Sequence, residues 1–173
     1  LYDAAEAERS YHTPPGTHVL LGHDEGDHAL VEVTMRMVDT CCEEGGGTML
    51  DLALVDHWLE KRNDVAALEA LISRGYVVDT MEVAGRWRDL PAIYERTVEA
   101  FLGVPGTLAA GAHQSHSYPD GACLYFTFAG KVDAGDRTAY HRTLWDAGQR
   151  AALDAGAALS HHHGVGLARS RFV

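Results

Sequence analysis

The sequence has few cysteines and no long apolar run. It contains three cysteines in 173 residues, an odd number, and two of them, Cys41 and Cys42, are adjacent in a helical pattern that cannot easily bridge them. A disulfide framework is therefore not expected, and the composition fits a reducing cytoplasm. No apolar run approaches the roughly 20 residues that cross a bilayer, so no membrane span is expected either.

Basic residues are also scarce. There are 14 Lys and Arg against 25 Asp and Glu, which gives a formal net charge of -11. This charge repels a phosphate backbone, and the basic residues are scattered rather than gathered into a stripe, so nucleic acid is not expected as a partner. The apolar share of 46% and the charged share of 23% are globular values, and the length suits one domain with a core.

Both ends lack features of a complete chain. The sequence begins at Leu1 with neither an initiator methionine nor a basic-then-apolar signal segment. It stops at Val173 without a closing helix or tail. We therefore expect one domain that is truncated at both ends.

Apolar spacing and turn residues predict a mixture of strands and helices. In chain order we expect a strand at 17–23, a helix after Asp27 that ends at glycines 45–47, two helices within 56–73, a strand at 76–84, a helix at 87–102, strands at 106–116 and 122–129, and a helix at 136–155. The turn Pro119-Asp120-Gly121 joins two of these strands as a hairpin. The order predicts an α+β fold, an antiparallel sheet with helices packed on one face in a ferredoxin-like arrangement.

The glycines at 45–47 resemble a phosphate-binding loop only superficially. Such loops follow a strand and hold the anion with the helix that comes after them. Here the glycines follow a helix. We therefore interpret them as the end of that helix.

Three consecutive histidines in the motif Ser-His-His-His-Gly-Val-Gly are the least ordinary feature. Imidazole titrates nearest to neutrality and can act as acid, base or metal ligand. In a strand His161 and His163 would face one side and His162 the other. Two neighbouring histidines can share a site only if the backbone turns there, which Gly164 and Gly166 permit.

Two alternatives to catalysis remain for the histidines. One is a metal site, but no cysteine or carboxylate stands at a zinc-type spacing beside them, so further ligands would have to come from His113, His116 or elsewhere. The other is a surface cluster without chemistry. We expect no metal, and keep a free-standing α+β module that binds a ligand or metal without catalysis as the alternative of another class.

Tyr125 and Arg62 are further candidates. Alternation places Leu124, Phe126 and Phe128 on one face of a strand, which leaves Tyr125 toward a cleft or solvent. Arg62 lies in a charged stretch, where a surface ion pair is the simplest explanation, although a guanidinium is well shaped to hold a carboxylate or phosphate. Spacing alone leaves both open.

Residues 113–128 (HQSHSYPDGACLYFTF) and 159–166 (LSHHHGVG) resemble the C-terminal region of alkyldihydroxyacetonephosphate synthase (alkylglycerone-phosphate synthase) and related FAD-linked oxidases. Residues 58–62 and 76–82 are also similar to it. The resemblance covers most of the chain from about Trp58 onward. It implies a cap, or substrate, domain with an antiparallel sheet and flanking helices over the isoalloxazine ring of FAD. The flavin-binding domain, which holds most of the FAD, is expected to be missing from residues 1–173.

The resemblance also implies roles for individual residues. In the synthase the flavin mediates exchange of the acyl group of acyl-dihydroxyacetone phosphate for a fatty alcohol, a step of ether lipid synthesis, and the resemblance implies the same reaction here. Tyr125 is implied as the acid/base group, and His162 and His163 are implied near the flavin and the reacting carbon. With His161 they are expected to contact the cofactor, and Arg62 is expected to bind substrate. Such roles suit a reaction that needs a positioned base and a cation for an anionic substrate.

A second reaction stays open, because some related enzymes oxidise 2-hydroxy acids such as lactate or glycolate. Just upstream of the hairpin this chain has His113, where the resemblance to the animal synthase implies an arginine. For a hydroxy acid, Arg62 would hold the carboxylate while a histidine takes the hydroxyl proton and hydride passes to the flavin. The expected partners are a small-molecule or lipid substrate, the flavin-binding domain of the same protein, and a second copy in a homodimer. The expected location is the cytoplasm, with membrane association if the substrate is a lipid.

Overall fold

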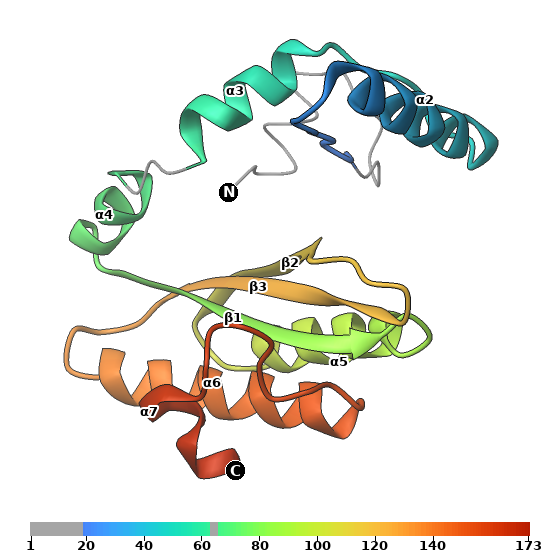
Figure 1. The fold of residues 1–173 in the computed structure, drawn as a ribbon. Coiled ribbons are helices and arrows are strands. Elements are labelled where there is room, and N and C mark those ends of the chain that lie inside the picture. Colours follow the sequence, from blue (N-terminus) through green and yellow to red (C-terminus); the bar gives the residue numbers. More distant parts are fainter. Residues whose placement is uncertain (1–18, 63–65) are drawn as a thin grey trace. The chain divides into compact units, whose positions relative to one another are not determined.

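A computed structural model describes residues 19–62 and 66–173. The chain divides into two compact units, Leu1–Asp64 and Val65–Val173. The positions of the two units relative to one another are not determined, so each is described by itself (Figure 1).

The described part of the first unit contains the helices α2 (His28–Glu44) and α3 (Ala53–Lys61). α2 begins where the side chain of Asp27 accepts hydrogen bonds from two backbone N–H groups of the first turn, at 3.0 and 3.3 Å. It ends at Gly45, whose N–H donates to a carbonyl of the last turn. Asp27 therefore caps the helix and Gly45 ends it, as the sequence predicted.

The predicted strand at 17–23 is wrong over residues 19–23, which form no strand and are mostly exposed; residues 17 and 18 lie outside the described residues. The physical reason is the lack of a pairing partner, since the described part of this unit contains no other strand to satisfy its backbone groups. Its core is small as well. Leu54 is the one buried residue described in this unit, and Leu30 and Met37 on α2 are 70% and 65% exposed.

The second unit contains most of the regular structure. Its elements are α4 (Ala66–Ser73), β1 (Tyr76–Arg86), α5 (Leu90–Leu102), β2 (Thr107–Ser115), β3 (Gly121–Lys131), α6 (Arg137–Asp154), the short α7 (Gly166–Arg169) and a 3₁₀ turn (Ser170–Phe172). The order confirms the prediction for this part of the chain, with α5 beginning at Leu90 rather than Trp87. None of the helices described in either unit combines the length and apolar character needed to cross a membrane.

The three strands form one antiparallel sheet in the order β1-β3-β2. β1 pairs with β3 from Tyr76 opposite Lys131 to Arg86 opposite Gly121, and β2 and β3 form the predicted hairpin. α5 and α6 lie on the same face of this sheet (Figure 1). The predicted α+β class is therefore confirmed.

The core lies between this sheet face and the two helices. Phe126 and Phe128 on β3 are buried, and the ring of Phe101 on α5 lies 6.0 and 4.4 Å from theirs. Leu124 is buried beside them, which confirms the predicted apolar face. Tyr125 points to the opposite face, which we call the polar face of the sheet.

Candidate active site at the histidine loop

After α6 the chain turns back along the free edge of β1. Gly156 adopts a positive φ of 94°, which permits the turn. Ala158 then pairs with Ala84, donating its N–H to the Ala84 carbonyl at 2.7 Å. Because β1 is an edge strand, this pairing leads the next residues, 160–164, onto the polar face. We call residues 160–164 the histidine loop.

Glu82 on β1 binds the histidine loop through its side-chain carboxylate. Its side chain is fully buried. Its carboxylate oxygens accept hydrogen bonds from the backbone N–H of His161 at 3.0 and 3.1 Å and from the hydroxyl of Ser160 at 3.0 Å. Burial raises the pKa of Glu82, but these hydrogen bonds and the nearby imidazoles outweigh it and leave the pKa below its usual value. The loop is therefore held by an ionised carboxylate.

Arg169 on α7 also binds the histidine loop. Its guanidinium donates to the hydroxyl of Ser160 at 3.0 Å, to the carbonyl of Gly164 at 2.7 Å and to the carbonyl of Glu82 at 2.7 Å. Arg169 is 4% exposed. It thus ties both ends of the histidine loop to β1, a role that the sequence pattern did not reveal.

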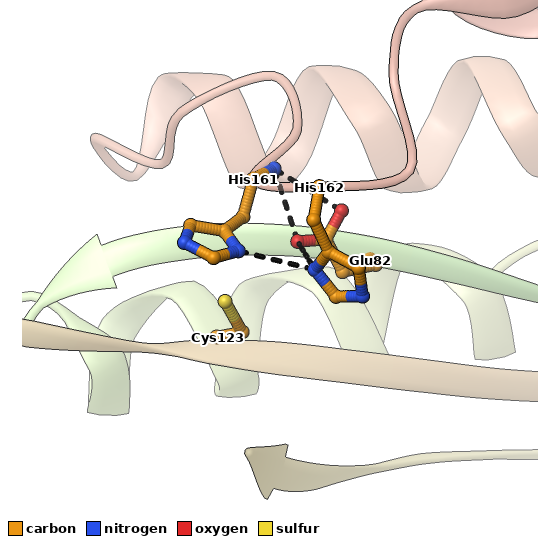
Figure 2. Close-up of side chains that lie close together, drawn as sticks. All are labelled: Glu82, Cys123, His161 and His162. Atoms are coloured by element: carbon orange, nitrogen blue, oxygen red, sulfur yellow. Dashed lines mark hydrogen bonds and ion pairs between the residues drawn. The ribbon is translucent and has the colours of Figure 1, made fainter. Parts of the chain in front are cut away.

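The three histidines share one cluster because the backbone bends at each of them and turns at Gly164, where φ is 74°. The Nδ1 atoms of His161 and His162 lie 3.1 Å apart, and Nδ1 of His162 lies 3.5 Å from Glu82 Oε1 (Figure 2). The ring of His163 lies 4.4 Å from that of His162. Partial burial lowers the pKa of His162, Glu82 raises it, and the neighbouring histidines lower it, so it stays below its usual value. This shift favours the neutral form of the His162 imidazole.

Tyr125 lies on the same face, since the strand register places it between Glu82 on β1 and His113 on β2. Its ring lies 5.0 Å from that of His113 and 5.2 Å from that of His163. Its hydroxyl is 3.1 Å from Thr80 Oγ1. The tyrosine and the end of the histidine triplet, far apart in the sequence, thus lie together.

Arg62 is not placed at this cluster. It follows α3 in the first unit, is exposed, and has its guanidinium 5.3 Å from the ring centre of Trp58. The position of that unit relative to the second is not determined. Its role in binding substrate stays a prediction.

An open pocket of about 330 Å³ borders the cluster. Its wall includes Cys123 and His161 together with Arg86, Tyr118 and Asp120. The pocket could take a polar group of a small ligand beside His161, with Arg86 as the cation in its wall.

Four residues here are of the types that bind zinc. Glu82, Cys123, His161 and His162 each have a ligand atom within 4.8 Å of the others (Figure 2). The sequence showed no cysteine or carboxylate beside the histidines, yet β1 and β3 bring both to them in space. However, both Glu82 oxygens already accept hydrogen bonds, and burial, followed by the charge of Glu82, raises the pKa of the Cys123 thiol to about 11. The hydrogen bonds of Glu82 are the contacts that the cluster shows, and the expectation of no metal stays a prediction.

A known protein family matches almost the whole chain. The family described as FAD linked oxidases, C-terminal domain, matches residues 3–173. The chain belongs to this family. Its curated relatives are an alkyldihydroxyacetonephosphate synthase and an FAD-linked oxidoreductase, so the match supports a family of FAD-linked enzymes. The resemblance inferred from the hairpin and the histidine motif is confirmed.

Curated relatives agree with this assignment. The domain is 31% identical over 116 residues to alkyldihydroxyacetonephosphate synthase of Dictyostelium discoideum, a match that covers 63% of this chain and 19% of the relative. It is 27% identical over 184 residues to YgcU, an uncharacterized FAD-linked oxidoreductase of Escherichia coli K12, covering 98% of this chain and 38% of the relative. The chain thus spans well under half the length of these relatives.

Solved structures show the same fold. An alkyldihydroxyacetonephosphate synthase structure superposes with a TM-score of 0.53 at 27% identity, over 60% of this chain and 20% of the other. A second structure of a protein with that name has a TM-score of 0.56 at 22% identity, over 76% of this chain and 24% of the other, and supports the fold alone. These comparisons establish the fold of the FAD-linked oxidase domain, and they do not identify its reaction.

Proposed function

We propose that this chain is the substrate-side cap domain of a longer FAD-dependent enzyme, and that Tyr125, His162 and His163 act on the substrate beside the flavin. The observation that carries the proposal is the convergence of a tyrosine hydroxyl and neighbouring imidazoles on one sheet face. These groups come from distant parts of the sequence, and the neutral His162 can accept a proton.

The polar face suits a flavin ring. The helices α5 and α6 lie on the other face, and this face carries the hydrogen-bonding side chains of Thr80, Glu82 and Tyr125 together with a few small apolar ones. FAD, when bound, would supply the ring that takes up the electrons of the substrate. His161, His162 and His163 would contact it, while most of the FAD would be bound by a flavin-binding domain of the same protein.

The first candidate reaction is exchange of an acyl group for a fatty alcohol on dihydroxyacetone phosphate. Its support is the synthase relatives, which include a second synthase from Trypanosoma brucei brucei at 28% identity. Tyr125, His162 and His163 would act at the reacting carbon, where the ring of His163 lies 5.2 Å from that of Tyr125. Arg62 would bind the phosphate.

The second candidate is oxidation of a 2-hydroxy acid, and His113 favours it. The ring of His113 packs against Tyr125, and partial burial lowers the pKa of His113, so this position offers no charged group at neutral pH. A carboxylate substrate needs fewer cations than a phosphate. Arg62 would then bind the carboxylate, and His162 would take the hydroxyl proton.

One experiment separates these reactions. The full-length protein is purified with FAD and mixed anaerobically either with acyl-dihydroxyacetone phosphate and a labelled fatty alcohol, or with lactate and glycolate. Labelled ether product without net bleaching of the flavin supports the first reaction, and bleaching by a hydroxy acid supports the second. A full-length protein without flavin, or one inert in both assays, contradicts the proposal and favours a module that binds a ligand or metal without catalysis.

The proposal also includes the location of the enzyme and its assembly. We propose a cytoplasmic enzyme that associates with a membrane if its substrate is a lipid. We further propose that the full-length enzyme forms a homodimer. Fractionation of cells and light scattering of the purified full-length protein test both.

A further inference from the structure

We propose that Glu82 is a positioning residue, which holds the His162 ring with its proton on Nδ1 and leaves Nε2 free to accept a proton from the substrate. The structural half of this inference, the tautomer, stands on the geometry of the histidine loop. The catalytic half rests on the proposed function.

The Glu82 carboxylate is itself rigidly held. One side bonds the Ser160 hydroxyl and the other the backbone N–H of His161, while Arg169 binds the Glu82 carbonyl and the Ser160 hydroxyl. These bonds prevent the carboxylate from turning away from the loop. They therefore fix Oε1 at 3.5 Å from Nδ1 of His162.

The surroundings of Nδ1 select one tautomer of His162. A neutral imidazole has one N–H donor and one acceptor nitrogen, whereas a carboxylate only accepts. Nδ1 of His162 faces the carboxylate of Glu82 and, at 3.1 Å, Nδ1 of His161, so the single proton of His162 is best placed on Nδ1 (Figure 2). Nε2 then carries the free lone pair. A carboxylate holds the histidine of a Ser-His-Asp triad in its working tautomer by the same principle.

Groups from several elements surround the His162 ring. The rings of His116, before β3, and His163 each lie 4.4 Å from it, and the ring of His161 lies 5.2 Å from it. The thiol of Cys123 on β3 belongs to the same cluster, while Arg169 on α7 binds the Gly164 carbonyl at the end of the loop. The other histidines all disfavour a charge on His162, and among these groups Glu82 alone favours one. Burial and the other histidines together lower the pKa of His162, and the carboxylate of Glu82 opposes them.

Nuclear magnetic resonance of the 173-residue chain tests the tautomer directly. Nitrogen-15 shifts of labelled histidines report which ring nitrogen carries the proton, and in the wild type we expect His162 protonated at Nδ1. In Glu82→Gln we expect a shift toward the Nε2–H form and a lower pKa of His162. The matched control is Asp79→Asn on the same strand, because Asp79 Oδ2 lies 2.7 Å from His141 Nε2. That variant should change the His141 signals and leave those of His162 alone.

Kinetics of the full-length enzyme test the catalytic half. Glu82→Gln should lower the rate of the substrate-dependent step roughly 10- to 100-fold, part of what a general base contributes, with FAD still bound and the acid limb of the pH profile moved to lower pH. The inference is overturned if the wild-type spectrum shows His162 protonated at Nε2. It is also overturned if the His162 signals do not respond to Glu82→Gln. The first result needs no variant, so it decides the tautomer even if Glu82→Gln folds poorly. A wild-type enzyme inert with every substrate, but with the expected spectra, instead contradicts the proposed function.

Discussion

At the scale of single residues, the Tyr125 hydroxyl can be removed with little change in packing. Its ring lies between His113 and His163, and its oxygen has one described hydrogen-bond partner, Thr80, at 3.1 Å. If this hydroxyl moves a proton in the reaction, Tyr125→Phe should slow substrate-dependent flavin reduction or alkyl exchange in the full-length enzyme by roughly 100-fold or more. FAD content and melting temperature should stay near wild type. Rapid-mixing absorbance measures the rate.

Tyr94→Phe is the matched control for this prediction. Tyr94 lies on α5, and its ring stacks on Phe126 at 6.4 Å, on the apolar side of the sheet. The chemical change is the same, but the hydroxyl is remote from the histidine loop. Wild-type rates in Tyr125→Phe, or an equal loss in both variants, would remove the assigned role from Tyr125.

The same scale shows what the sequence could reveal about the site. Tyr125 was found because alternation along β3 sends it away from the core, and the histidines because three stand in a row. Glu82 and Arg169 were missed. In an alternating strand a glutamate on the polar side suggests solvent, and only the return of residues 160–164 across β1 buries it. Because a segment far along the chain buries Glu82, the sequence around Glu82 carries no pattern that reveals this burial.

At the scale of elements, α5 and α6 pack closely because Gly148 lies where they meet. A methyl group at Gly148 would overlap the ring of Phe101. That ring is fully buried between Phe126 and Phe128 and cannot easily move. We expect Gly148→Ala to lower the free energy of unfolding by roughly 1 to 3 kcal/mol, the usual cost of overpacking, despite the higher helix propensity of alanine. Chemical denaturation followed by circular dichroism measures the change.

Gly135→Ala is the control for this substitution. A methyl group at Gly135, just before α6, would meet nothing within 4 Å, and its φ is not in the left-handed region. We expect its stability to stay within about 0.5 kcal/mol of wild type, as for most surface changes. If Gly148→Ala were as stable as Gly135→Ala, the packing of α5 on α6 described above would be incorrect.

The helices and strands of the second unit were predictable because each carries its own signal. α6 is bounded by Asp136 before it and Gly156 after it, and the β2–β3 hairpin has Pro-Asp-Gly in its turn. The strand expected at 17–23 had only apolar composition in its favour. A strand also needs a neighbour, and no local sequence pattern specifies whether one is present.

At the scale of the whole molecule, the predicted site residues belong to two units whose relative positions are not determined. Tyr125 and the histidine loop belong to the second unit, and Arg62 belongs to the first. The family match covers residues 3–173, while the curated relatives extend well beyond the matched region. The sequence motif identified the family, but it could not place Arg62, because no short-range pattern fixes how two units dock.

The open polar face leads to a prediction about the cofactor. Ligand sites usually bury 70 to 90% of a bound molecule in a pocket of about 300 to 1,000 Å³, and FAD is a large dinucleotide with a charged diphosphate. The pocket beside the histidine loop is open and near the lower end of that range, and a net charge of -11 opposes binding of an anion. We therefore expect the 173-residue chain, mixed with excess FAD and passed through a gel-filtration column, to elute without flavin. The full-length protein is the control and should elute yellow. A stoichiometric yellow complex of the 173-residue chain would mean that this domain holds the cofactor by itself, so that a separate flavin-binding domain is not needed to retain FAD.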